Sequence, residues 1–76
     1  MNMIRRKKLS DIIAQLVSIK ESIESVLEEE EEARDSMPES LQTCERYEIS
    51  DEACNNLGDA IDSLDEAIDR LEEASN

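Results

Sequence analysis

Arg46 and Tyr47, which are neighbours in the sequence, have the chemistry to hold a nucleotide. A guanidinium group binds phosphate through charge-assisted hydrogen bonds, and an aromatic ring stacks on a nucleobase. Tyr47 is the only aromatic residue of the chain. Other polar residues should reach the same end of the expected fold, where they would contact the phosphate or the edges of the base. The candidate ligand-binding residues are therefore Arg46, Tyr47, Arg34, Gln42, Glu30 and Asn55.

A simpler arrangement of the same residues is the alternative. Buried polar groups usually satisfy one another. Arg46 would then pair with Glu30, and Tyr47 would close the end of the fold as a hydrophobic lid.

The sequence offers little else for chemistry. It contains no histidine, and its single glycine, Gly58, lies inside an expected helix instead of a phosphate-binding loop. Carboxylates at Asp62, Asp65, Glu66 and Asp69 have the oxygen ligands that Mg²⁺ and Ca²⁺ prefer. At this spacing they are more typical of a hydrated helix face. We therefore predict a protein that is not an enzyme and has no cofactor and no metal site.

The elements that must position these residues follow from two runs of apolar residues, spaced alternately three and four apart. That spacing keeps one seam of side chains facing a partner helix. The first run is Leu9, Ile12, Leu16, Ile19, Ile23, Val26, Glu30, Ala33 and Met37. The second run is Tyr47, Ser50, Cys54, Leu57, Ile61, Leu64, Ile68 and Leu71.

These runs predict an all-α fold, an antiparallel helical hairpin that forms a single domain over residues 1–76. Pro38 should end the first helix, because the residue before a proline is pushed out of the helical region. Ser50 is a suitable N-cap for the second helix. We expect the first helix over about residues 3–36, a structured elbow over 37–49 and the second helix over about 50–74. Glu30 should then lie near Cys54 and Asn55.

Both helices carry apolar residues outside the predicted seam, and a single hairpin cannot bury them. These residues are Ile13, Val17 and Leu27 on the first helix, with Ala53, Ala60, Ala67 and Ala74 on the second. We therefore expect a homo-oligomer, a dimer or higher, that forms a helical bundle.

The net charge of −13 argues against direct binding of nucleic acid. The four consecutive basic residues at 5–8 should lie beside Asp69, Glu72 and Glu73 in the hairpin. No apolar run approaches the length of a membrane span, and we expect no membrane partner and a location in the cytoplasm of a host bacterial cell. The two cysteines, Cys44 and Cys54, are too few for a disulfide framework.

The elbow carries a distinctive motif, Met-Pro-Glu-Ser-Leu-Gln at residues 37–42, followed by Glu-Arg-Tyr-Glu at 45–48. In both motifs the chain resembles a family of small acidic proteins encoded by phages, prophages and mobile elements of Gram-positive bacteria. In that family the first motif tends to read Asn-Met-Pro-Glu-Asn-Leu-Gln, so Ser36 and Ser40 depart from it. The resemblance implies a phage or mobile-element origin, and it implies no defined activity and no functional residues.

These observations favour a host-defence antagonist that sequesters a small nucleotide-type ligand at the elbow end of the bundle. The alternative is an acidic mimic of DNA, or an inhibitor of a basic host nuclease or defence protein. The acidic residues for that role are Glu28 to Glu32, Asp62, Asp65, Asp69 and Glu72. A structural or adaptor coiled-coil protein is the third hypothesis.

Overall fold

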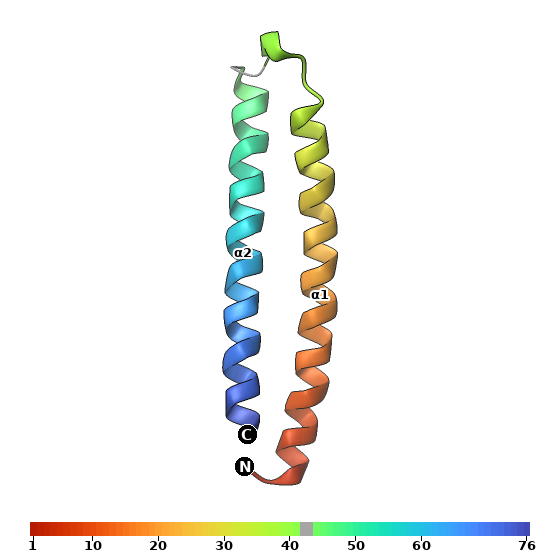
Figure 1. Ribbon diagram of the computed structural model, residues 1–76, viewed down its shortest axis with the longest axis vertical. Helices are drawn as coiled ribbons and strands as arrows, with labels where there is room; N and C mark the ends of the chain where they lie inside the picture. Colours follow the sequence, from red (N-terminus) through yellow and green to blue (C-terminus); the bar gives the residue numbers. More distant parts are fainter. Residues whose placement is uncertain (42–43) are drawn as a thin grey trace.

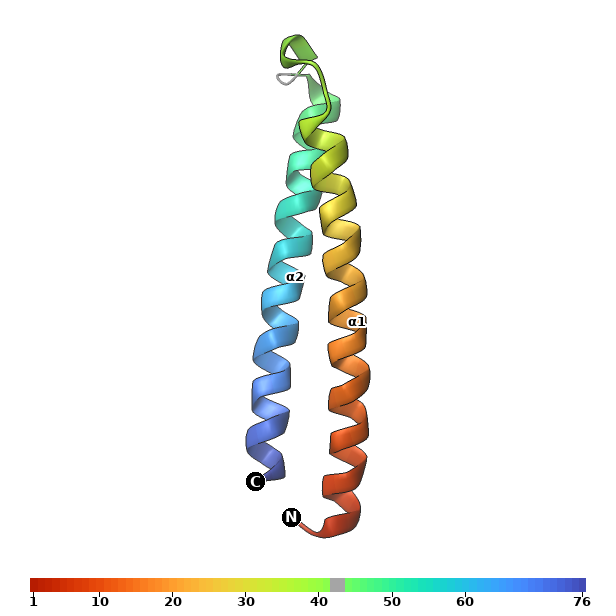
Figure 2. The same ribbon diagram turned by 45° about the vertical axis from the view of Figure 1, so that its right-hand side comes forward.

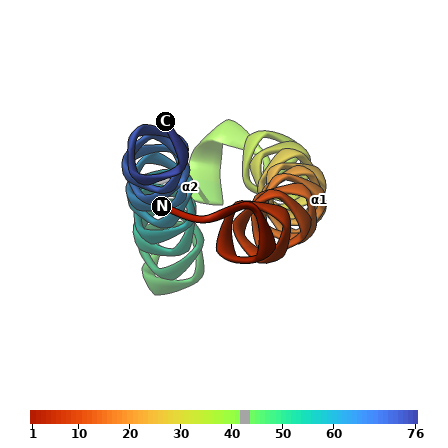
Figure 3. The same cartoon turned by 90° about the horizontal axis from the view of Figure 1, so that it is seen from below.

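The protein is a hairpin of two long antiparallel helices (Figure 1). The structure is a computed structural model that describes residues 1–41 and 44–76. Helix α1 (Met3–Asp35) leads to the short 3₁₀ helix η1 (Glu39–Leu41), and helix α2 (Glu45–Ser75) returns alongside α1. The molecule is a thin rod of 59 × 15 × 12 Å. Two views at right angles show that α1 and α2 form a single layer (Figures 1 and 3). The prediction of an all-α hairpin is confirmed.

Helix α1 has a defined cap at each end. The side-chain oxygen of Asn2 accepts a hydrogen bond from the backbone N–H of Arg5 at 2.9 Å, which satisfies one of the unpaired donors of the first turn. At the other end the backbone N–H of Ser36 donates to the carbonyl oxygen of Glu32 at 2.9 Å. Pro38 follows two residues later. The helix therefore ends within one residue of the predicted position.

Helix α2 begins at Glu45, so the predicted start at about residue 50 is wrong. Cys44 has the extended backbone of an N-cap residue, and Glu45 and Glu48 place negative charge at the positive end of the helix dipole. Ser50, the predicted cap, is buried one turn inside the helix. Its hydroxyl donates to Glu30 Oε1 at 2.7 Å. The elbow is correspondingly shorter than the predicted 37–49.

The packing seam on α2 lies where the sequence predicts it. The predicted seam residues, from Tyr47 to Leu71, are all buried or half-buried. Ser50, Cys54 and Ile68 are the most buried of them.

The seam on α1 is only half as predicted. The column of residues seven apart that contains Leu9, Leu16 and Ile23 is half-buried. The other predicted column is exposed: Ile12 is 43% accessible, Ile19 50% and Val26 52%. Its place is taken by the column on the opposite flank of Leu16, which is Ile13, Lys20, Leu27 and Arg34.

Polar side chains account for this difference. Lys20 and Arg34 lay their alkyl stems along the seam while their charged ends reach acidic residues of α2. Lys20 Nζ is 2.6 Å from Asp65 Oδ1, and Arg34 Nη1 is 2.9 Å from Asp51 Oδ1. A lysine and an arginine therefore belong to the packed side of α1, while isoleucines of the same helix remain at the surface.

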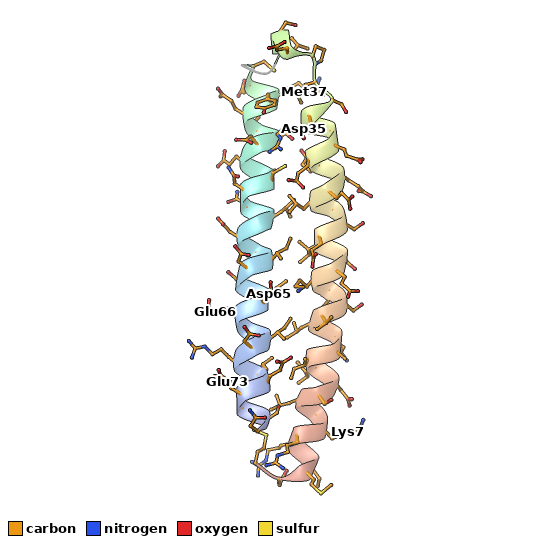
Figure 4. The ribbon with its side chains drawn as sticks, in the orientation of Figure 1. Lys7, Asp35, Met37, Asp65, Glu66 and Glu73 are labelled. Atoms are coloured by element: carbon orange, nitrogen blue, oxygen red, sulfur yellow. The ribbon has the colours of Figure 1, made fainter. Side chains whose placement is uncertain are left out.

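At the terminal end, the predicted pairing of the basic residues 5–8 with the end of α2 is not formed. Within the described residues the basic run makes one ion pair, between Lys7 and Asp11 along α1 at 3.3 Å. The labelled side chain of Lys7 points away from α2 (Figure 4). The two chain ends nevertheless lie at the same end of the rod (Figures 1 and 2).

Candidate functional site

The two broad sides of the hairpin differ in chemistry. On one side Lys20 and Arg34 reach across the seam to Asp65 and Asp51. The Ile12 column of α1 lies on the other flank of the seam, because residues three and four positions from Leu16 lie on opposite sides of it. On α2 the column Ala53, Ala60, Ala67 and Ala74 likewise lies across the seam from Asp51 and Asp65. The Ile12 column and the Ala53 column, which are exposed except at the half-buried Ala53, therefore share one side of the hairpin, which we name the apolar face.

The register aligns these two columns in layers. Since Lys20 is level with Asp65, Ile19 is level with Ala67 and Val26 with Ala60. The same register places Ala33 level with Ala53 near the elbow. Large and small residues therefore alternate across most of the face, and both residues are small at the elbow end.

Two adjoining hollows open at this elbow end. The first has a volume of about 330 Å³ and is lined by Ala33, Ser36, Met37, Pro38, Leu41, Cys44 and Arg46. The second has a volume of about 340 Å³ and is lined by Glu30, Ala33, Met37, Arg46, Ile49 and Ser50. Ala33, Met37 and Arg46 line both. Met37 lies where α1 passes into the elbow (Figure 4).

The structure brings together only some of the six predicted ligand-binding residues. Arg46 and Glu30 line the second hollow. Tyr47 is half-buried in the seam and Asn55 is exposed, and neither lines these hollows. Gln42 lies outside the described residues.

Arg34 is occupied by carboxylates on the side away from the hollows. Its Nε lies 3.0 Å from Asp35 Oδ1, and its Nη1 lies 2.9 Å from Asp51 Oδ1. The hydrogen bond to Asp35 raises the pKa of the Arg34 guanidinium above its usual value, and the charge of Asp35 adds to the effect. A phosphate that bound Arg34 would have to compete with two acidic residues.

Arg46, in contrast, forms no ion pair with any residue of the described part of the chain. The alternative in which it pairs with Glu30 is not seen, because Glu30 accepts a hydrogen bond from Ser50 instead. A cationic group beside an apolar wall, without a carboxylate partner, is suited to bind an anion.

Sequence reasoning missed the apolar lining of the hollows, mainly Ala33, Met37 and Ile49. A signal was present in the column Ile12, Ile19, Val26 and Ala33, which becomes small only at its last member. The level residue Ala53 is also small. Two small residues at one level leave space between helices that larger side chains would fill.

Other sites find little support in residues 1–41 and 44–76. These residues contain no group of three acidic, cysteine or histidine side chains placed to hold a metal ion. Among them there is also no helix that is both long enough and apolar enough to span a bilayer. Cys54 is buried, and burial raises the pKa of its thiol above the usual value.

Comparison of the chain with protein-family models, with curated proteins and with solved structures gives no match.

Proposed function

We propose that the protein is a non-enzymatic binding protein of phage or mobile-element type, which sequesters a small nucleotide-type ligand at its elbow end and so antagonises a host defence. It works as an oligomeric bundle in this proposal. The observation that carries the proposal is the position of Arg46, which lines both elbow hollows and makes no ion pair in the described chain.

The hollows offer the two kinds of contact that a nucleotide needs. Arg46 binds a phosphate by charge-assisted hydrogen bonds. Met37, Leu41 and Ile49 provide an apolar wall for the base or the sugar ring. Glu30 and Ser50, which are hydrogen-bonded to each other, are the acidic and the uncharged polar residue that line the second hollow. The apolar wall replaces Tyr47 as the surface on which the base rests.

Calorimetry with a panel of cyclic and linear nucleotides tests this proposal. Substitution Arg46→Ala removes the phosphate contact and should lower the affinity about 10- to 150-fold, as loss of a hydrogen bond to a charged group does. Arg6→Ala is the matched control, because Arg6 is an exposed arginine that lies outside the apolar face and far from the elbow of its own chain. Failure of every nucleotide to bind, or equal affinities for the two variants, would contradict the proposal.

A second function, binding to a basic host protein, is favoured by the distribution of acidic residues. Glu66 and Glu73 project from the outer side of α2, away from α1 (Figure 4). Glu28 to Glu32 give α1 a continuous acidic turn near the elbow. Such an array can occupy a groove that otherwise receives nucleic acid.

Replacement of Glu28 to Glu32 by glutamine tests this second function. It should abolish binding to the basic partner and leave helicity unchanged, and binding of the unmodified protein should weaken steeply with added salt. Binding that survives the replacement would exclude mimicry by this stretch.

A further inference from the structure

The apolar face is nearly free of acidic residues, although the chain carries 21 of them. On α2 the face and its edge are two neighbouring columns outside the seam, and neither contains an acid. The first is Ala53, Ala60, Ala67 and Ala74, and the second is Ile49, Asn56, Ser63 and Arg70. On α1 the corresponding columns contain a single acid, Glu29. A solvated side of so acidic a protein would not exclude acids in this way.

The face also carries apolar side chains that the hairpin does not bury. Ile12, Ile19 and Val26 are all exposed, and Ile49 is 60% accessible. The buried apolar core of the described chain is confined to Cys54 and Ile68. A two-helix layer of this size needs a second layer to stabilise it.

We propose that a second copy of the chain covers the apolar face in antiparallel orientation, so that each elbow hollow receives Arg5 of the other copy. The dimer is independent of the proposed function, and only the role of Arg5 in the elbow hollow rests on it. The two-fold axis passes near Ile19, perpendicular to the long axis of the rod, and α1 of one copy packs against α1 of the other.

Charge selects this orientation. The edge column of α1 beside the apolar face reads Lys8, Gln15, Ser22 and Glu29. Reversal about Ile19 brings Lys8 of each copy next to Glu29 of the other, and the uncharged Gln15 next to Ser22. The opposite arrangement, with a two-fold axis along the rod, would set Glu29 of one copy beside the uncharged Asn56 of the other and would leave Lys8 without an acidic partner at this edge. Opposite charges at the edge of a helix interface set the orientation in this way.

The same reversal completes the ligand site. Arg5 belongs to the column of Ile12, Ile19, Val26 and Ala33. Arg5 of one copy therefore lies opposite Ala33 of the other, and Ala33 lines both hollows. Arg46 and Arg5 then approach one hollow from two copies. Two guanidinium groups favour a ligand with two adjacent phosphates, and they create a local basic site within an acidic protein.

Cysteine cross-linking tests the orientation, in a background with Cys44→Ser and Cys54→Ala whose helicity is checked first. Ile19→Cys places two thiols together at the two-fold axis and should give a covalent dimer of twice the 8.6 kDa chain mass on oxidation. Val17→Cys is the control, because Val17 is an exposed residue of the same helix on the other side of the seam. If Ile19→Cys stays monomeric, or if both variants link equally, the antiparallel dimer is wrong. A covalent dimer that forms only in the double variant Ile19→Cys with Ala67→Cys would also overturn it, in favour of the axis along the rod.

Binding of inorganic pyrophosphate tests the role of Arg5 separately. Arg5→Ala should lower the affinity at least about tenfold while the mass of the dimer is unchanged, as expected for one lost charge-assisted contact. Arg6→Ala is the control, since Arg6 lies on the opposite flank of the seam. Equal affinities of the two variants would refute the shared site, although the cross-linked dimer would stand. Absence of binding by pyrophosphate and by all nucleotides would refute the proposed function and leave the dimer intact.

Discussion

Lys20 of α1 and Asp65 of α2 lie 2.6 Å apart across the hairpin, and they fix the register of the two helices. A slip of α2 by one heptad would leave the apolar seam intact, because leucine and isoleucine recur every seven residues. The same slip would place Lys20 opposite Gly58 in one direction and Arg34 opposite Gly58 in the other, so either slip removes an acidic partner. Apolar repeats permit several alignments, and a polar pair within them selects one.

Alanine substitution of two neighbouring isoleucines should distinguish the packed side of α1 from its exposed side. Ile13→Ala removes a half-buried seam residue and should lower the free energy of unfolding by about 1–2 kcal/mol. Ile12→Ala alters an exposed residue of the apolar face and should change stability much less in dilute solution. Urea unfolding followed by circular dichroism measures both. An equal loss in the two variants would show that the seam lies between the two residues.

Removal of the hydroxyl of Ser50 should destabilise the hairpin. Ser50→Ala leaves the carboxylate of Glu30 without its donor, at a cost of about 1–2 kcal/mol. The double variant Ser50→Ala with Glu30→Ala should recover part of this loss, because both polar partners are then gone. Thermal unfolding of the parent, of each single variant and of the double variant measures this coupling, which strictly additive effects would exclude.

Gly58→Ala should stabilise α2. Gly58 lies in the middle of the helix, and a methyl group added there would meet no atom within 4 Å beyond its two chain neighbours and the adjoining backbone of its own helix. Alanine exceeds glycine in helix stability by about 0.5–1 kcal/mol. The expected outcome is a higher urea midpoint without a change in slope. The substitution lies outside the apolar face, so the dissociation constant of the dimer should not change.

The two thiols should differ in reactivity, and stability should fall in alkali. Burial raises the pKa of Cys54 above that of a thiol in the unfolded chain, so the folded state binds a proton more tightly. Its contribution to stability is complete below the unfolded pKa of about 8.5 and is lost as the pH rises through the folded pKa. Unfolding between pH 7 and 10 should show this decline, and Cys54→Ala should reduce it.

At neutral pH a thiol reagent should modify the half-buried Cys44 well before Cys54.

Heptad spacing was sufficient to predict two helices, their antiparallel arrangement and the whole seam of α2. It could not decide the seam of α1, because Leu9, Leu16 and Ile23 have an apolar column on each flank. Purely apolar residues favour the Ile12 column, and the structure uses the column that contains Lys20 and Arg34. Only the pairing with Asp65 and Asp51 on the other helix explains this choice, and such contacts are not visible in one helix taken alone.

The candidate site was predicted in part for a similar reason. The elbow position of Arg46 follows from the sequence. Arg34 and Asn55 do not line the hollows with Arg46 once the helices pack side by side. Arg34 instead points toward Asp51. Serine is a residue type that often caps helices, which is why the sequence predicts Ser50 as a cap. Its burial inside α2 depends instead on its hydrogen bond to Glu30 of the other helix.

Both ends of the chain emerge from the same tip of the rod (Figure 2). A fluorophore attached at residue 1 or 76 would therefore lie at the tip opposite the elbow of its own chain. Two such labels on an antiparallel pair would sit at opposite tips, separated by nearly the 59 Å length of the hairpin. Energy transfer between dyes at the chain ends of the two copies would therefore measure the length of the pair.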